Sequence, residues 1–206
     1  MTVKLSLATL DQAKATAAIP AYDPKTLSHG IVHFGVGNFH RAHQAIYLDD
    51  LFNTGKGHDW AITGAGVMPS DAAMREKLKS QDFLTTVVEQ DNNKTGARVT
   101  APMIDIIAPG ETAALIEKLA DPATRIVSMT ITEGGYFIDA AGHFNPAHPA
   151  MVEDAKNPTA PKTVFGLILA GLKVRKERGL APFTIMSCDN IPGNGEVTES
   201  TVIGLA

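Results

Sequence analysis

Apolar and polar positions along most of the chain follow two alternating patterns, short apolar runs and longer stretches of helical spacing. Residues 31–35 (IVHFG) form an apolar run that ends in glycine, and residues 40–53 follow with apolar side chains at near-helical spacing. Residues 60–66 predict a second strand, and residues 70–81 predict a second helix. Strands that alternate with helices of this length predict an α/β fold, a doubly wound and mostly parallel sheet with helices on both faces.

The later part of the chain continues this alternation. We expect strands at residues 83–89, 98–107 (interrupted by Pro102), 125–132 and 183–188, and helices at residues 111–120, about 161–178 and from about 196 onwards. Residues 92–96 predict a turn, so the segment around it is either a hairpin or an edge of the sheet. Residues 141–161 hold four prolines and predict a loop with one short helix near Met151, and Pro161 marks the start of the long helix.

The last helical pattern is still presenting an apolar face at the end of the sequence. Val197, Thr201, Val202 and Leu205 share that face, and neither a glycine nor a proline closes it. We expect a truncated last helix, and the alternative is a short terminal helix that docks on the sheet.

Composition narrows the class of protein. The 206 residues are 44% hydrophobic and 19% charged, which excludes collagen-like, coiled-coil and disordered chains. The single cysteine, Cys188, excludes a disulfide framework and a zinc site of several thiolates. A net charge of −4 without a long basic run argues against a nucleic-acid partner. No segment approaches 18 continuous apolar residues and the N-terminus lacks a secretory pattern, so we expect no membrane partner and a cytoplasmic location.

The first candidate for chemistry is the glycine-containing segment between the first strand and the first helix. Gly35 would permit the tight turn, and Gly37 would let backbone amides approach a pyrophosphate. His40 stands where the third glycine of the usual pattern would be, so the alternative is a glycine turn without a ligand. The candidate cofactor-binding residues here are Gly35, Val36, Gly37, Asn38, Phe39, His40 and Arg41. The main fold begins with the strand before this segment. We therefore expect an N-terminal extension, residues 1–28, and a dinucleotide-binding domain, residues 29–206.

An acidic residue after the second strand would hold the hydroxyls of the adenosine ribose, and Asp71 is the candidate. Its charge would repel a 2′-phosphate and favour NAD over NADP. The alternative is that Asp71 only caps the helix that begins near Ser70. His40 and His43 have helical spacing but no acidic or cysteine partner on the same short element, so we expect no metal site.

Two loops follow later strands, residues 132–136 and 188–192. In an open parallel sheet, ligands bind beyond the carboxyl ends of the strands. Asn190 could therefore donate to a substrate oxygen that becomes negative during hydride transfer, and Glu133 could contact substrate or cofactor. Asp189 could merely hold its loop, and turn chemistry is the alternative for all three.

Four ordered motifs carry a resemblance to a known family: IVHFGVGNFHRAHQA (31–45), SMTITEGGY (128–136), PKTVFG (161–166) and SCDNIPGNG (187–195). The chain from about residue 20 onwards resembles the N-terminal half of the polyol-specific long-chain dehydrogenases. The resemblance implies a Rossmann-like domain of a metal-independent oxidoreductase that interconverts a sugar alcohol and a ketose with NAD. Within that family it favours mannitol and fructose; the alternatives are arabinitol oxidation and fructuronate or tagaturonate reduction.

The resemblance also implies roles for single residues. Residues 35–41 wrap the cofactor, Asp71 favours NAD, and Asn190 helps to stabilise the developing alkoxide. The family's general base is a lysine in a motif with asparagine and histidine, in a helical C-terminal domain, and nothing in this chain matches that motif. We therefore expect the chain by itself to bind dinucleotide but to show little dehydrogenase activity. A catalytically inactive, stand-alone dinucleotide-binding module is the alternative.

Overall fold

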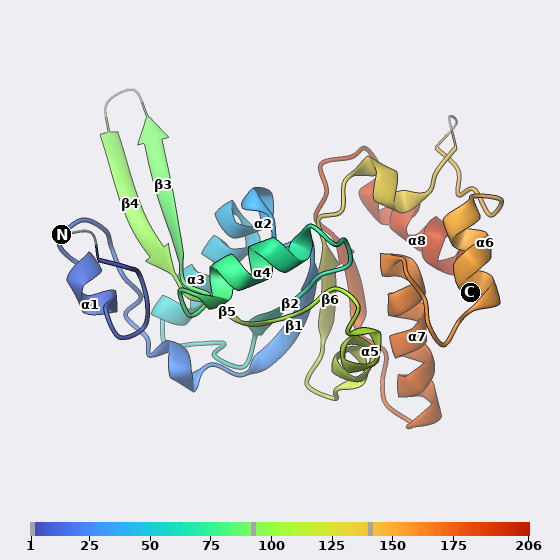
Figure 1. Ribbon diagram of the computed structural model, residues 1–206, viewed down its shortest axis with the longest axis horizontal. Coiled ribbons are helices and arrows are strands. Elements are labelled where there is room, and N and C mark those ends of the chain that lie inside the picture. Colours follow the sequence, from blue (N-terminus) through green and yellow to red (C-terminus); the bar gives the residue numbers. More distant parts are fainter. Residues whose placement is uncertain (1–2, 92–93, 140–141) are drawn as a thin grey trace.

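The computed structural model describes residues 3–91, 94–139 and 142–206, and a five-stranded sheet forms its centre (Figure 1). Neighbouring strands in this sheet run parallel, in the order β5-β2-β1-β6-β7. The strands are β1 (His29–Phe34), β2 (Ala61–Ala65), β5 (Met103–Ile107), β6 (Ile126–Met129) and β7 (Thr184–Ser187). The predicted doubly wound α/β fold is confirmed.

Helices occupy the connections between the parallel strands. The α-helices are α1 (Leu10–Ala13), α2 (Asn38–Ala42), α3 (Gln44–Asn53), α4 (Asp71–Lys79), α5 (Thr112–Ala120), α6 (Pro149–Lys156), α7 (Val164–Glu177) and α8 (Asn194–Leu205), and the 3₁₀ helices are η1 (Pro24–Thr26) and η2 (Glu133–Tyr136). Among the described residues, no helix is both long and apolar enough to cross a membrane.

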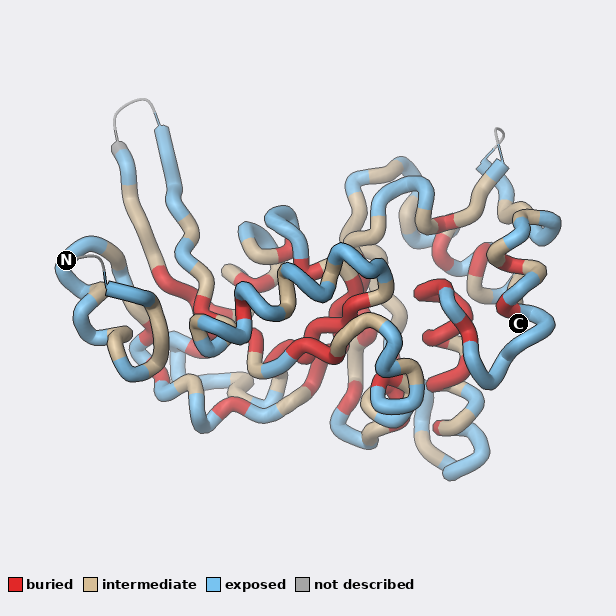
Figure 2. Tube along the Cα trace, in the orientation of Figure 1, coloured by how far each residue is buried: buried red, intermediate tan, exposed pale blue. Residues whose placement is uncertain are grey.

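The two faces of the sheet carry different helices because side chains alternate along each strand. Phe34 joins Leu119 of α5 and Ile168 of α7 in one buried cluster. Ile31 joins Leu78 of α4 in a second cluster on the opposite face. The central strands are consequently buried along most of their length, as the red segments in Figure 2 show.

Pro102 divides a segment that the sequence pattern predicts as one strand. The strand expected at 98–107 is two strands, β4 (Lys94–Thr100) and β5, because Pro102 has no N–H to continue a ladder. The β4 strand pairs with β3 (Thr85–Asp91) in an antiparallel hairpin outside the main sheet, which settles the choice between hairpin and edge. Residues 92–93 of the expected turn lie outside the described residues. The hairpin projects from the body of the domain (Figure 1).

Two helices begin or break at positions that differ from the predicted ones. The helix expected at 40–53 is interrupted at His43, where the backbone leaves helical geometry with φ −126° and ψ −86°. The long helix begins at Val164 rather than at Pro161. Thr163 caps it, because its Oγ1 accepts a hydrogen bond from the N–H of Gly166 at 3.1 Å.

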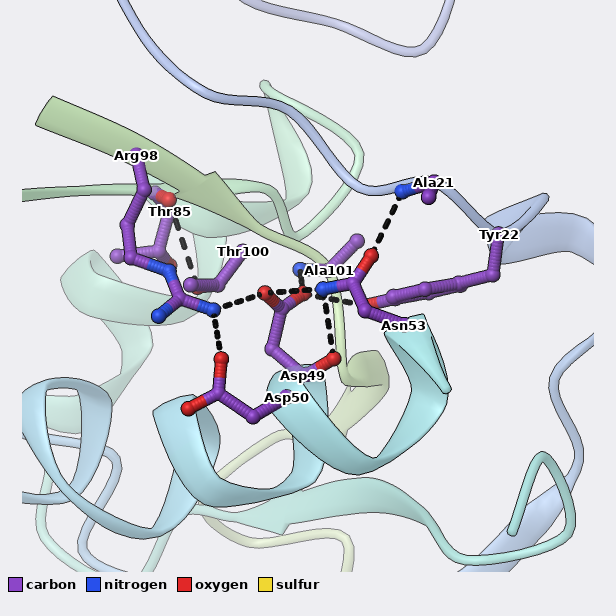
Figure 3. Close-up of polar contacts among 9 residues, drawn as sticks. All are labelled: Ala21, Tyr22, Asp49, Asp50, Asn53, Thr85, Arg98, Thr100 and Ala101. Carbon is purple, nitrogen blue, oxygen red and sulfur yellow. Dashed lines mark hydrogen bonds and ion pairs between the residues drawn. The ribbon is translucent and has the colours of Figure 1, made fainter. Parts of the chain in front are cut away.

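Asp49 of α3 connects three segments that are far apart in sequence (Figure 3). Its buried carboxylate accepts hydrogen bonds from the Tyr22 hydroxyl at 2.6 Å, the Arg98 guanidinium at 2.7 Å and the Ala101 N–H at 3.3 Å. Burial and the hydrogen bond to Asp49 raise the pKa of Tyr22, which keeps the hydroxyl a donor. The described part of the N-terminal segment and the hairpin are thus held to the same helix.

Replacement of Asp49 by alanine should destabilise the protein by about 3 kcal/mol, because it leaves buried donors on Tyr22 and Ala101 without their acceptor. The matched control is Asp50→Ala. Asp50 pairs with the same arginine but its side chain is 58% exposed, so its loss should cost under about 1 kcal/mol. Urea unfolding of both variants measures the difference, and equal losses would contradict the role given to Asp49.

Candidate functional site

The largest cavity that we describe lies beyond the carboxyl ends of β1, β6 and β7. Its volume is about 640 Å³. Residues from the first glycine turn, the start of α4 and the two later loops line it: Gly35, Val36, Gly37, Asn38, Phe39, Ser70, Asp71, Met74, Thr130, Thr132, Glu133, Asp189 and Asn190. The chain moves from β1 to β2 and β5 on one side and places β6 and β7 on the other, so the cavity lies at the switch point where ligands bind in such sheets.

The two glycines of the first turn have different physical roles. Gly35 has φ +89°, and a side chain there would meet the Thr130 carbonyl oxygen at 2.0 Å from its Cβ. Gly37 has ordinary backbone angles, and a Cβ there would have no atom within 4 Å. Gly35 is therefore required by the packing of the turn against β6. Gly37 leaves open space on the cavity side, where a bound molecule can approach the backbone.

A buried polar layer supports this turn from beneath. His33 donates from Nε2 to the Gly35 carbonyl at 3.2 Å and accepts at Nδ1 from the Ser128 hydroxyl at 2.7 Å. Gln44 donates to Ser128 at 3.1 Å and accepts from His40 Nδ1 at 3.1 Å. This assignment of donors follows from the carbonyl, which can only accept. The layer fixes the glycine turn relative to β6 and α3.

His40 belongs to this layer and not to the cavity wall. Its ring is buried, stacks on the ring of His33 with 3.7 Å between centroids, and leaves Nε2 without a partner in the described structure. Burial lowers the pKa of His40 to about 4 and that of His33 well below its ordinary value. Both rings are therefore neutral at pH 7.

Arg41 also supports the turn from the side. Its guanidinium donates to the Val36 carbonyl and, at 2.6 Å, to Asn38 Oδ1. Neither Arg41 nor His40 lines the cavity, whereas Gly35, Val36, Gly37, Asn38 and Phe39 do so. The sequence predicts seven neighbouring cofactor-binding residues, and the structure places five at the cavity and two behind them.

Asp71 is the first residue of α4 but does not cap it, because the helix has no side-chain cap hydrogen bond. Its Oδ2 accepts hydrogen bonds from the N–H groups of Val67 and Met68, both at 2.9 Å, so the carboxylate organises the turn before α4. Asp71 also lines the large cavity and a second, smaller one of about 320 Å³. That smaller cavity has mainly apolar walls, including Val67 and Ile131.

The loops after β6 and β7 are joined by Asp189. Its carboxylate accepts from the N–H groups of Ile131 at 2.9 Å and Thr132 at 3.0 Å, and from the Tyr136 hydroxyl at 2.6 Å. Glu133 and Asn190, the other two candidates from these loops, are exposed and line the same cavity. The structure thus brings the predicted residues of both loops to one site.

Four residues that line the cavity were not among the candidates from the sequence: Ser70, Met74, Thr130 and Thr132. Thr130 was hidden because residues 125–132 read as one continuous strand, whereas β6 ends at Met129. The sequence held one signal that the strand ends earlier, because Gly134 and Gly135 follow closely and glycines commonly mark a turn.

The remaining groups that could take part in catalysis are the thiol of Cys188 and side chains that could bind a metal ion. Cys188 is half-buried at the end of β7, and burial raises the pKa of its thiol. The described part of the chain holds no group of three or more His, Cys, Asp or Glu side chains that could bind a metal ion.

A parallel sheet in this order, with a glycine turn after its central strand and a cavity at the switch point, defines a Rossmann-type nucleotide-binding domain. Residues 29–206 match the family model described as the mannitol dehydrogenase Rossmann domain, and the chain belongs to that family. The resemblance found in the four sequence motifs is confirmed.

Relatives of known activity cover the chain almost completely. It is 58% identical over 188 residues to the mannitol 2-dehydrogenase of Cereibacter sphaeroides, which is 91% of this chain and 39% of the relative. It is 42% identical to the polyol:NADP oxidoreductase of Gluconobacter oxydans, over 96% of this chain and 41% of that protein. The Pseudomonas fluorescens mannitol 2-dehydrogenase, solved in ternary complex with NAD and D-mannitol, superimposes with a TM-score of 0.95 at 46% identity, over 98% of this chain and 42% of that one. The chain thus spans about two fifths of the length of these relatives.

The buried histidines predict a loss of stability in mild acid. A folded-state pKa of about 4 for His40, against an ordinary 6.5, means that the unfolded chain binds more protons between these two values. The stability contribution is therefore complete above pH 6.5 and decreases as the pH falls towards 4. For His40 alone the free energy of unfolding should drop by roughly 1–2 kcal/mol from pH 7 to pH 5.

Urea unfolding at the two pH values measures this drop. His40→Gln should reduce it, because glutamine does not titrate. The matched control is His143→Gln, which makes the same substitution at a histidine whose side chain is 80% exposed and lies outside the buried layer. An identical pH dependence in wild type and His40→Gln would contradict the assignment.

Proposed function

We propose that residues 1–206 form the NAD-binding part of a dehydrogenase that interconverts a sugar alcohol and a ketose, with D-mannitol and D-fructose as the pair. The observation that carries this proposal is the meeting of the glycine turn, Asp71, Glu133 and Asn190 around one cavity at the switch point of the sheet. The family membership and the mannitol dehydrogenases among the relatives support the reaction class.

The residues present fit a dinucleotide. The open space at Gly37 is a cradle that any side chain would fill, and backbone N–H groups at the start of α2 have no partners within the helix. Gly35, Val36, Gly37, Asn38 and Phe39 would hold the pyrophosphate. Asp71 would hold the adenosine ribose.

The strand order gives the cofactor a direction. Asp71 follows β2 on one side of β1, whereas Glu133 and Asn190 follow β6 and β7 on the other. The nicotinamide end therefore belongs with Glu133 and Asn190. A negative charge at Asp71 disfavours the 2′-phosphate of NADP, which supports NAD as the cofactor of this chain even though one relative is named for NADP.

Bound NAD would supply the hydride acceptor, and the chain itself would bind, orient and stabilise charge. Asn190 lines the cavity, and its side-chain amide would donate to the substrate oxygen as that oxygen becomes negative. His40 and Arg41 act through the turn, by holding Gly35 and Val36 in place. No lysine motif for removal of the hydroxyl proton is matched in residues 1–206, so this part supplies cofactor binding and oxyanion stabilisation without the base.

Gly37→Val should abolish saturable NADH binding and leave the fold intact, because the valine side chain enters the open space that a pyrophosphate needs while the backbone angles of residue 37 suit any residue. Titration of NADH fluorescence measures binding, and thermal unfolding checks the fold. The companion variant Gly35→Ala should instead destabilise the protein by several kcal/mol (~3 or more), because its methyl group would overlap the Thr130 carbonyl.

Gly37→Val tests cofactor binding, and Gly35→Ala tests the packing of the turn against Thr130. NADH affinity of Gly37→Val within twofold of wild type would refute the cofactor assignment. Absence of saturable NADH binding in the wild-type chain would refute the proposed function itself.

NAD-dependent oxidation of mannitol by the 206-residue chain should be slower than that of ordinary enzymes by at least about 10²-fold, because general-base catalysis alone contributes roughly 10²–10⁴-fold. Production of NADH with mannitol, arabinitol and sorbitol as parallel substrates measures this. Turnover of roughly 1–10³ s⁻¹ would show that the chain carries its own general base. It would contradict the proposal that residues 1–206 supply only cofactor binding and oxyanion stabilisation.

A further inference from the structure

Asp189 lines the cavity next to Asn190 but has no role in the proposed function, although its carboxylate accepts three hydrogen bonds. Two of its donors are backbone N–H groups of the β6 loop, from Ile131 and Thr132, and the third is the hydroxyl of the fully buried Tyr136. Asp189 sits on the β7 loop, so a single carboxylate bridges the two loops that carry Glu133 and Asn190.

The backbone of the β6 loop is strained at the residue that Asp189 holds. Thr132 has φ +62° and ψ 169°, a region that is essentially limited to glycine and is especially unfavourable for a β-branched residue. A strained conformation persists only where the surrounding contacts enforce it. The 3.0 Å hydrogen bond from the Thr132 N–H to Asp189 Oδ1 is such a contact, made directly at the strained residue.

The strain has a consequence for the cavity. Thr132 and Glu133 line it from the β6 side, and Asn190 lines it from the β7 side. The turn at Thr132 leads directly into η2, where Glu133 is the first residue and Tyr136 the last. Relaxation of Thr132 would therefore redirect Glu133 and separate the two loops.

We propose that Asp189 is a positioning residue, which holds Thr132 in its strained conformation and thereby sets Glu133 and Asn190 around the nicotinamide end of the cofactor. The proposal rests on the proposed function, because it requires the nicotinamide at these two loops. Asp189 borders the cavity, but in this role it acts through its hydrogen bonds to the β6 loop and not by binding the cofactor.

Hydrogen bonds from two neighbouring segments hold Asp189 in place. The Tyr136 hydroxyl lies 2.6 Å from both Asp189 Oδ2 and Ser187 Oγ, and Asn194 donates to the Asp189 carbonyl at 3.1 Å. Burial and the neighbouring Asp189 raise the pKa of Tyr136, so the hydroxyl remains a donor throughout the neutral range. The carboxylate thus holds the loop above from a fixed position.

The first experiment compares NADH with ADP-ribose, which lacks the nicotinamide, as ligands of wild type and Asp189→Asn. Asparagine has the same shape, but its NH₂ group faces one of the backbone donors and loses that hydrogen bond. NADH affinity should fall about tenfold, the change that corresponds to about 1.4 kcal/mol. ADP-ribose affinity should stay within twofold, because Gly37 and Asp71 are not held by Asp189. A general loss of structure would weaken both ligands equally.

The second experiment tests the strain directly. Thr132→Gly in the Asp189→Asn background should restore NADH affinity to within about threefold of wild type, because glycine adopts the observed backbone angles without a restraint. Thr132→Ala in the same background should restore nothing, since alanine keeps the Cβ that opposes this conformation. The comparison of the two double variants remains informative even if Asp189→Asn alone folds poorly, because Thr132→Gly removes the backbone strain at residue 132 and Thr132→Ala does not.

The matched control is Asp121→Asn. Asp121 likewise accepts a backbone hydrogen bond, from Ala123 at 2.9 Å, but it precedes β6 and lies at the opposite end of the sheet. It should change neither affinity. Equal NADH affinity in wild type and Asp189→Asn, or equal rescue by glycine and alanine, would overturn the positioning role. Absence of NADH binding in the wild type would instead refute the proposed function.

Discussion

The close approach of β1 and β6 at their carboxyl ends is the constraint on which the site depends. The Gly35 carbonyl accepts a hydrogen bond from Thr130 Oγ1 at 2.6 Å, and the Gly35 Cα lies so near the Thr130 carbonyl that no side chain fits between them. Because the two strands meet there, the chain after β1 must turn sharply into α2. The residues of this turn and the start of α2, Gly35 to Phe39, line the cavity.

Three carboxylates, of which Asp49 and Asp154 are buried, hold segments that the sheet does not. Asp49 joins the N-terminal segment and the hairpin to α3, and Asp189 joins the β6 and β7 loops. Asp154 of α6 does the same before α7, where it accepts from the N–H groups of Lys162 and Thr163 at 2.8 and 2.9 Å. In each case one carboxylate accepts several hydrogen bonds from a connecting segment and so holds its irregular backbone in place.

Much of the fold was predictable from the sequence because the strands and helices have clear periodicity. The order of elements was right, and the errors fall where a local interaction overrides the pattern: the break at His43, the division of one expected strand at Pro102 and the cap at Thr163. The site was predictable to the level of its loops. It was less predictable to the level of side chains, since His40 and Arg41 belong to the glycine motif by position but point away from the cavity.

The sequence by itself determined the alternation of strand and helix, the glycines of the first turn and the family, because these depend on residue types at short spacing. Only the tertiary structure decided what the polar side chains do. Asp71 holds the turn before α4 and lines the cavity, Asp189 bridges two loops, and His40 is a stacked member of a buried layer. Each of those roles depends on partners brought from elsewhere in the fold, and the direction of a side chain is set by packing rather than by its neighbours in sequence.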